Sequence, residues 1–150
     1  MSIRTTFMVG FPGETEKQFE ELLGFVRWAG FDHLGVFVFS PEKGTSAARL
    51  GERVKPEVAQ RRLNAIMALQ AELSQAKNRQ LIGQVVPVLI EGPSTETDLL
   101  LAGRTARMAP DVDGRVLINK GEARVGEIAA VRINEAYEYD LVGEIVVNGV

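Results

Sequence analysis

The chain has 150 residues, of which 45% are hydrophobic and 25% charged, with a net charge of −3. This composition is typical of a globular protein that buries a core, as one domain or two small ones. Cysteine is absent and His33 is the single histidine, which excludes disulfides and iron–sulfur ligation and argues against a catalytic triad or a histidine metal site. We therefore predict neither catalytic nor metal-ligating residues within this chain.

No apolar run approaches the roughly 18 residues needed to span a bilayer, and the N-terminus lacks the basic-then-apolar pattern of a signal peptide. We expect a cytoplasmic protein with no membrane partner.

A strand and a helix are predicted at the start of the chain. Residues 4–9 alternate weakly and end in three apolar residues, which indicates a buried strand. Thr15 and Gln18 have the spacing of a capping box, and Gly30 fits the position after the last helical residue. The buried stripe of this helix is expected at Phe19, Leu22, Leu23, Val26 and Ala29.

A second strand and helix follow. Residues 34–39 are nearly all apolar, as in a parallel strand covered on both faces. Pro56 fits the first turn of a long helix that runs to about residue 78, with a buried stripe at Leu63, Ile66, Met67, Gln70 and Leu73. The order strand, helix, strand, helix is typical of a parallel sheet or barrel. Because two parallel strands do not make a stable sheet, we interpret residues 1–79 as the last βαβα portion of a larger barrel.

The pattern changes near residue 81. Short β-prone runs alternate with Gly, Pro, Asn and Asp, and predict five strands at residues 85–91, 98–103, 115–118, 127–133 and 141–147. Such a series suggests a small antiparallel barrel. The fold class is therefore α/β followed by all-β, with one domain at 1–79 and another at 80–150.

Three segments resemble the end of the barrel of radical-SAM methylthiotransferases. They are TTFMVGFPGETEKQFEELLGFV (5–26), GVFVFSPEKGTSAARL (35–50) and RRLNAIMALQAELS (61–74). The later segments IGQVVPVLIEGP, GRTARMAPDVDG and NEAYEYDLVGE are similar to the TRAM domain, an OB-like barrel, that follows it. GFPGET recurs across radical-SAM enzymes, whereas the whole ordered set is specific and covers nearly the entire chain.

Two branches of that family differ in the loop after the second strand. The tRNA-modifying branch typically carries Arg-Pro before the Gly-Thr of this loop, whereas here the sequence is Ser40-Pro41-Glu42-Lys43-Gly44-Thr45. With Glu42 at this place, and with GRTARMAPDVDG and NEAYEYDLVGE further on, the chain resembles the RimO-type branch, which methylthiolates an aspartate of a small-subunit ribosomal protein. The family's two 4Fe–4S clusters need cysteines that this chain lacks, so the clusters belong to the parent protein and the fragment should be inactive alone.

The resemblance implies a partial site for S-adenosylmethionine (SAM) at the carboxyl ends of the two strands, where barrels bind ligands. An adenine needs an apolar slot and a few backbone hydrogen bonds, and a glycine lets the backbone approach closely. The residues that would face SAM are Met8, Val9, Gly10, Phe11, Phe39 and Ser40. The alternative is that GFPGET is only a tight strand-to-helix connection and Phe39-Ser40 a strand end before a proline turn. For Glu14, near the start of the helix, we favour a structural role.

The second domain is acidic. Residues 79–150 hold 7 Lys and Arg and 11 Asp and Glu, a balance of −4, with Glu135, Glu138, Asp140 and Glu144 expected to crowd one end. Arg104 and Arg107 lie close in sequence and could form a basic patch. We predict that Arg104, Arg107, Glu138 and Asp140 contact the substrate. Opposite charge favours a basic ribosomal protein as partner; RNA binding would need a basic face. The alternatives are the tRNA-modifying branch, a free-standing TRAM RNA-binding module, and acidic residues that only keep the domain soluble.

Overall fold

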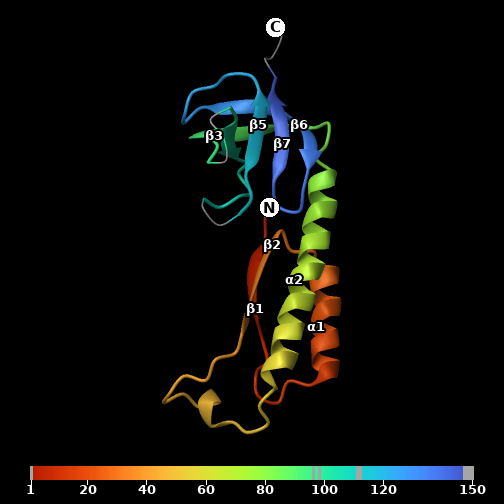
Figure 1. The fold of residues 1–150 in the computed structure, drawn as a ribbon. Coiled ribbons are helices and arrows are strands. Elements are labelled where there is room, and N and C mark those ends of the chain that lie inside the picture. The colour runs from red at the N-terminus through yellow and green to blue at the C-terminus, as the bar shows by residue number, and fades with distance from the viewer. Residues whose placement is uncertain (1, 96, 98, 111–112, 147–150) are drawn as a thin grey trace. The chain divides into compact units, whose positions relative to one another are not determined.

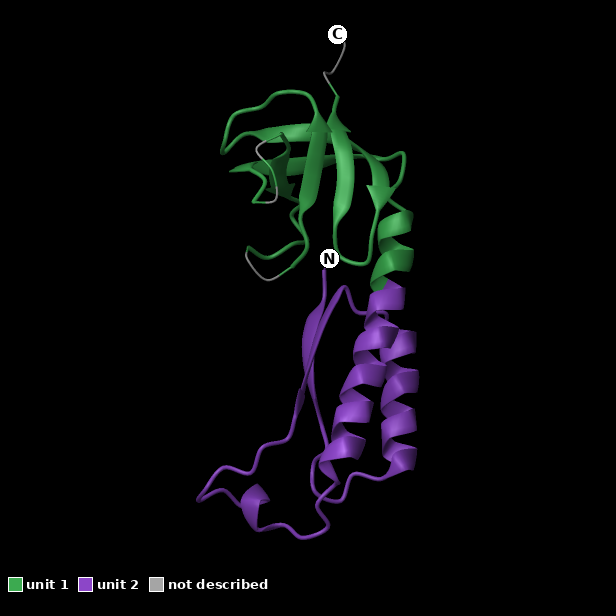
Figure 2. Cartoon of the chain, viewed as in Figure 1, with its two compact units in different colours: residues 1, 74–150 green, residues 2–73 purple. Residues whose placement is uncertain are grey.

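The computed structural model describes residues 2–95, 97, 99–110 and 113–146 (Figure 1). Residues 2–73 form one compact unit, and a second comprises residues 74–146 (Figure 2). No helix in these described ranges is both long enough and apolar enough to cross a membrane.

The first unit contains a parallel two-stranded sheet with two helices. Strand β1 (Arg4–Val9) pairs with β2 (His33–Val38) over six registered positions, and α1 (Glu16–Ala29) connects them. The predicted capping box is confirmed: the Thr15 hydroxyl accepts from the Gln18 amide, and the Gln18 side chain accepts from the Thr15 amide. Gly30 ends α1 in the left-handed region, with φ of 55°.

The long helix α2 (Pro56–Arg79) follows a loop that contains the short 3₁₀ helix η1 (Ala47–Arg49). Both helices lie on the same side of the β1–β2 sheet (Figure 1), and the core between them includes Val9, Phe19, Val26, Leu34 and Ile66. The buried residues of α2 are Ala59, Arg62, Ile66, Leu69 and Gln70, whereas Leu63, Met67 and Leu73 of the predicted stripe are only partly buried.

The expectation that the second strand is covered on both faces is wrong for this chain. Successive residues of a strand point to opposite faces, and only one face of the sheet meets the helices. On the other face, Met8 is 41% exposed and its register partner Phe37 is 47% exposed. Strand β2 therefore carries more apolar side-chain surface than the described residues cover.

The second unit contains a closed five-stranded barrel in the order β3-β4-β5-β7-β6. Its strands are β3 (Val85–Pro93), β4 (Leu101–Arg104), β5 (Val116–Lys120), β6 (Ile128–Ala136) and β7 (Leu141–Ile145). The predicted number of strands is confirmed. Of the predicted strand residues, 98 and 147 lie outside the described ranges.

The prediction that this barrel is wholly antiparallel is wrong. Strands β5 and β7 pair in parallel, whereas the other four neighbouring pairs are antiparallel. The reason is one of parity: direction can alternate all the way round a closed ring only when the number of strands is even. A closed ring of five strands must therefore contain a parallel pair. Here that pair is β5 and β7, which the chain connects through β6.

The barrel interior is filled by alternating residues of β3, β5, β6 and β7, with the partly buried Leu101 of β4 packed against them, as expected for a small barrel. The core residues are Val88, Ile90, Val116, Ile118, Ala129, Val131, Ile133 and Leu141. The last helical turn of α2 joins this unit, because the Asn78 side-chain amide donates to the Tyr137 and Glu138 carbonyls of the β6–β7 turn at 3.1 and 3.3 Å.

Candidate functional site

The GFPGET segment forms the turn between β1 and α1. Gly10 has φ of 75°, and an added Cβ there would lie 2.7 Å from the Ala59 Cβ of α2. The Glu14 amide donates to the Phe11 carbonyl at 2.9 Å, and the Gly13 amide donates to the Glu52 carbonyl at 3.0 Å. Gly10 is thus required for a close approach between the loop and α2, in addition to its left-handed backbone.

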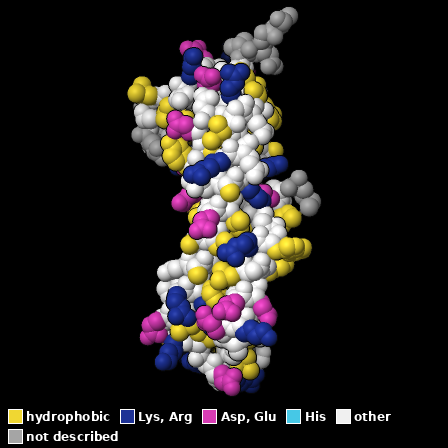
Figure 3. Space-filling model, turned by 90° about the vertical axis from the view of Figure 1, so that its right-hand side faces the viewer, with side chains coloured by type: hydrophobic (Ala, Val, Ile, Leu, Met, Phe, Trp, Pro, Cys, Tyr) yellow, Lys and Arg dark blue, Asp and Glu magenta, His cyan; other side chains and the backbone are white. Residues whose placement is uncertain are grey.

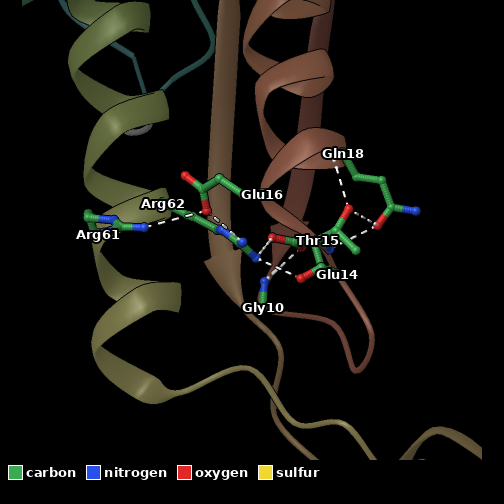
Figure 4. Close-up of polar contacts among 7 residues, drawn as sticks. All are labelled: Gly10, Glu14, Thr15, Glu16, Gln18, Arg61 and Arg62. Carbon is green, nitrogen blue, oxygen red and sulfur yellow. Dashed lines mark hydrogen bonds and ion pairs between the residues drawn. The ribbon is translucent and has the colours of Figure 1, made fainter.

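An ion cluster that is buried at Arg62 and Glu14 but exposed at Glu16 holds this loop (Figure 4). The Arg62 Nη1 donates to Glu14 Oε1 at 2.6 Å and to the Glu14 carbonyl at 3.2 Å, while Nη2 donates to Glu16 Oε2 at 2.9 Å. The other carboxylate oxygen of Glu14 accepts the Gly10 amide at 2.9 Å. The side chains of Arg62 and Glu14 are only 4% and 14% exposed. Glu14 therefore has the structural contacts that the sequence favoured.

The charges in this cluster influence one another. Burial, the largest influence, lowers the pKa of Arg62, but the hydrogen bonds and charges of Glu16 and Glu14 together raise it above its ordinary value. The hydrogen bond from Arg62 lowers the pKa of Glu16, against a smaller opposing effect of desolvation. The guanidinium also lies 5.3 Å from the centroid of the Phe19 ring, within cation–π range.

Sequence reasoning missed Arg62, although a signal exists. It sits one turn before Ile66 on the apolar stripe of α2, where a charged residue must find a partner when buried. The partner carboxylates lie 46 and 48 residues away, so no local pattern identifies them.

The aromatic residues predicted to face SAM come together. Phe11 follows β1 and Phe39 follows β2, and their rings meet edge to face with centroids 5.2 Å apart. Phe11 is 40% exposed. The Phe39 amide donates to the Val9 carbonyl at 2.8 Å, which continues the sheet by one bond. Together with the exposed Met8, these rings form an accessible apolar surface at the carboxyl end of the sheet.

The other three predicted residues lie differently. The Val9 side chain is fully buried in the core. The Gly10 amide donates to the Glu14 carboxylate, and the α-carbon of Gly10 faces α2. Ser40 is exposed after the end of β2. Of the six residues, Met8, Phe11 and Phe39 therefore carry the accessible side-chain surface that an apolar ligand could contact.

The barrel residues predicted to contact a substrate are spread over one end of adjacent strands. Arg104 at the end of β4 pairs with Glu91 at 2.8 Å. In the following turn, the Arg107 amide donates to the Thr105 hydroxyl at 3.3 Å. The register that aligns Gly103 with Val116, and Val116 with Leu141, places Arg104, Arg115 and Asp140 near one another at this end. Arg115 was not predicted.

Asp140 has a structural contact. Its Oδ1 accepts the Arg115 amide at 2.8 Å, and the side chain is partly buried. Glu138 is exposed in the β6–β7 turn. Within this group of four, Glu138 is therefore the acidic residue best placed to meet a partner.

The expected crowding of four acidic residues at one end is wrong for Glu144, whereas Glu135, Glu138 and Asp140 all lie at or beside the β6–β7 turn. Glu144 lies along β7, 3.7 Å from an Arg132 nitrogen and 3.9 Å from the Lys120 nitrogen, and Glu135 accepts from the Tyr137 hydroxyl at 2.7 Å. On the face drawn in Figure 3, Lys and Arg side chains are interspersed with Asp and Glu. Strand register therefore separates Glu144 from the other three acidic residues and places it beside two basic side chains.

Within the part of the chain that the structure describes, no three His, Asp or Glu side chains are grouped to hold a metal ion. With no cysteine in the sequence, these residues do not fit a 4Fe–4S cluster.

Comparison with known proteins finds one matching domain family and several similar proteins. Residues 82–146 match the TRAM domain. The chain is 52% identical over 146 residues to the ribosomal protein uS12 methylthiotransferase RimO of Syntrophotalea carbinolica. It is 50% identical over 145 residues to the proteins of the same name from Syntrophobacter fumaroxidans and Bdellovibrio bacteriovorus.

Each of these alignments covers 97% of this chain and 32–33% of the relative. The chain thus spans about a third of the length of the curated relatives it matches, and the similarity runs through both compact units. Over that third, the chain is similar to methylthiotransferases of the RimO type, and residues 82–146 match the TRAM domain.

Proposed function

We propose that this chain is part of an enzyme that methylthiolates an aspartate of the small-subunit ribosomal protein uS12. The observation that carries the proposal is about 50% identity, sustained over 97% of the chain, to proteins named for that activity. In this proposal residues 1–79 are the C-terminal portion of the radical-SAM barrel, residues 80–150 are the TRAM domain that docks the substrate, and the enzyme acts in the cytoplasm.

The proposed contribution of the first domain is a partial SAM site formed by Met8, Val9, Gly10, Phe11, Phe39 and Ser40. The exposed side chains of Met8 and Phe11, beside Phe39, offer the apolar surface that an adenine or methionine moiety needs. In radical-SAM enzymes a reduced 4Fe–4S cluster cleaves SAM. Because this chain has no cysteine, both clusters of the enzyme would be held by residues outside it.

The proposed contribution of the barrel is electrostatic docking of a basic protein. The −4 balance of residues 79–150 favours encounter with a cationic partner and disfavours the phosphate backbone. Glu138 is the most accessible of the predicted acidic contacts, whereas Asp140 would contribute through the position of Arg115.

A second candidate, RNA binding by the barrel, is favoured by one observation. Arg104 and Arg115 lie at the same barrel end, and Arg107 follows in the adjoining turn. Such a group could neutralise phosphates locally despite the net charge.

One experiment separates the two. The full chain is titrated with purified uS12 and with a tRNA anticodon arm, each at low and at physiological salt. We expect tighter binding of uS12, weakened severalfold by Glu138→Lys. The matched control is Glu122→Lys, an exposed acidic residue between β5 and β6, which changes net charge equally and should have the smaller effect.

Preference for the RNA, lost in Arg107→Glu, would instead support the tRNA-modifying branch. Equal weakening of uS12 binding by both lysine substitutions would contradict a specific docking role for Glu138, because only net charge would then matter.

A further inference from the structure

The carboxylate of Glu14 connects two parts of the first unit. One oxygen accepts the Gly10 amide at 2.9 Å, and the other accepts from Arg62 Nη1 at 2.6 Å. Gly10 directly precedes Phe11, whose ring meets Phe39. A chain of contacts therefore runs from Arg62 on α2 through Glu14 to the Gly10 amide (Figure 4), directly before the residue whose ring meets Phe39.

This arrangement is not the one expected if stability alone were at stake. Buried ion pairs lose much of their Coulombic gain to desolvation, and apolar replacements of similar volume are often equally stable. Among the described residues, the buried Arg62 Nε has no hydrogen-bond partner, although such nitrogens are usually satisfied. What the cluster does provide is direction, because charge-assisted hydrogen bonds fix geometry more strongly than apolar packing.

The loop needs such direction. Gly10 is in the left-handed region with φ of 75°, where glycine has wide conformational freedom. The hydrogen bond from its amide to Glu14 selects one orientation of the peptide, and Arg62 holds the accepting carboxylate in place.

We propose that Arg62 is a positioning residue for the cofactor-facing loop: through Glu14 it orients the Gly10–Phe11 backbone and so places Phe11 against Phe39. The identity of the ligand as SAM rests on the proposed function above. The role of Arg62 in orienting the loop does not depend on that function.

The test uses the full chain labelled with ¹⁵N. The readout is exchange of the Gly10 amide, compared with the Val26 amide in the core of α1 as a measure of unfolding of the whole unit. Arg62→Met keeps an unbranched side chain, shorter than that of arginine, and removes its donors. We expect Gly10 exchange relative to Val26 to accelerate about tenfold or more, in line with the strength of hydrogen bonds to charged groups. Arg62→Lys, which keeps one charged donor, should restore part of the protection.

Two variants make the comparison specific. Glu14→Gln should accelerate Gly10 exchange as Arg62→Met does. It replaces Arg62→Met in the test if that variant fails to fold. Glu16→Gln removes the second carboxylate partner of Arg62, which does not bond Gly10, and should leave the ratio of the two exchange rates unchanged. A ratio that stays constant in both Arg62→Met and Glu14→Gln would overturn the proposal, since the cluster would then only stabilise the unit.

SAM is then titrated into the same samples, with the Phe11 and Phe39 amide shifts as readout. We expect saturable shifts in the wild type. In Arg62→Met the dissociation constant for SAM should be about tenfold higher, which is equivalent to about 1.4 kcal/mol of binding free energy. Equal SAM binding by a variant that has lost Gly10 protection would overturn the cofactor-positioning role. No shift in the wild type, with Gly10 still responding to Arg62, would refute the proposed SAM site and leave the orientation of the loop by Arg62 supported.

Discussion

Arg62 on α2 and Glu14, which directly precedes the N-cap of α1, form an ion pair with a 2.6 Å hydrogen bond. The two residues are 48 positions apart in the sequence. The pair is nearly inaccessible to solvent, and the free carboxylate oxygen of Glu14 holds the Gly10 amide. An ordinary strand-to-helix turn is thereby tied to a helix that begins more than forty residues later.

Gly10→Ala is expected to destabilise the first unit by about 2–5 kcal/mol. A left-handed φ costs a residue with a Cβ roughly 1–2 kcal/mol, and the clash with Ala59 adds overpacking of about 1–3 kcal/mol. Urea unfolding followed by circular dichroism at 222 nm, where α1 and α2 dominate, measures the loss.

The control is Gly44→Ala. Gly44 has φ of 89°, but an added Cβ there meets nothing within 4 Å, so only the backbone cost of roughly 1–2 kcal/mol applies. Equal losses in the two variants would show that the approach of α2 imposes no steric requirement on Gly10.

Acid should weaken the first unit partly through Glu16. Hydrogen bonding by Arg62 lowers the pKa of Glu16 below its ordinary value of 4.5. A carboxyl whose pKa is lower when folded stabilises the protein above the unfolded pKa, and this contribution disappears as the pH falls through the folded pKa. Wild type should therefore lose more stability than Glu16→Gln between pH 7 and acidic pH, measured by urea unfolding at each pH.

The exposed Glu20, one turn further along α1, provides the matched control. Glu20→Gln should retain the acid sensitivity of the wild type. If Glu20→Gln and Glu16→Gln flattened the pH profile equally, the ion pair with Arg62 would not be its cause.

Truncation inside the barrel should be much more costly than truncation outside it. Ile133 is fully buried in β6, and Ile133→Ala is expected to cost about 2–5 kcal/mol. Ile128, at the start of the same strand, is 69% exposed, so Ile128→Ala should change stability by no more than about 0.5 kcal/mol. Hydrogen exchange of the Val131 amide reports the stability of the barrel, and similar losses from both variants would contradict the assigned strand register.

Tyr137 should lose its hydroxyl proton at a higher pH than an ordinary tyrosine. Its hydroxyl donates to Glu135 at 2.7 Å, and this hydrogen bond and the carboxylate charge raise the pKa of Tyr137 above 10.0. Stability from this bond is fully present below the unfolded pKa and is lost as the pH rises through the folded one. The difference between the phenolate absorbance curves of wild type and Tyr137→Phe isolates Tyr137, and Glu135→Gln should shift that transition to lower pH.

The sequence by itself determined the local elements of this protein. The Thr15–Gln18 capping box and the Gly30 helix end were predicted because such signals act within a few residues of backbone. The number of barrel strands followed from apolar runs between turn residues, and the resemblance carried by GFPGET and the TRAM segments agrees with the relatives found.

Only the tertiary structure decided which distant residues meet. It showed the parallel β5–β7 pair that a closed ring of five requires, and the register that pairs Glu144 with Arg132 and Lys120 instead of leaving four acidic residues together. It also brought Arg62 to Glu14. The physical reason is the same in each case: hydrogen bonds and ion pairs act over a few ångströms of space, and the separation of two residues along the chain does not predict that distance until the path of the backbone is known.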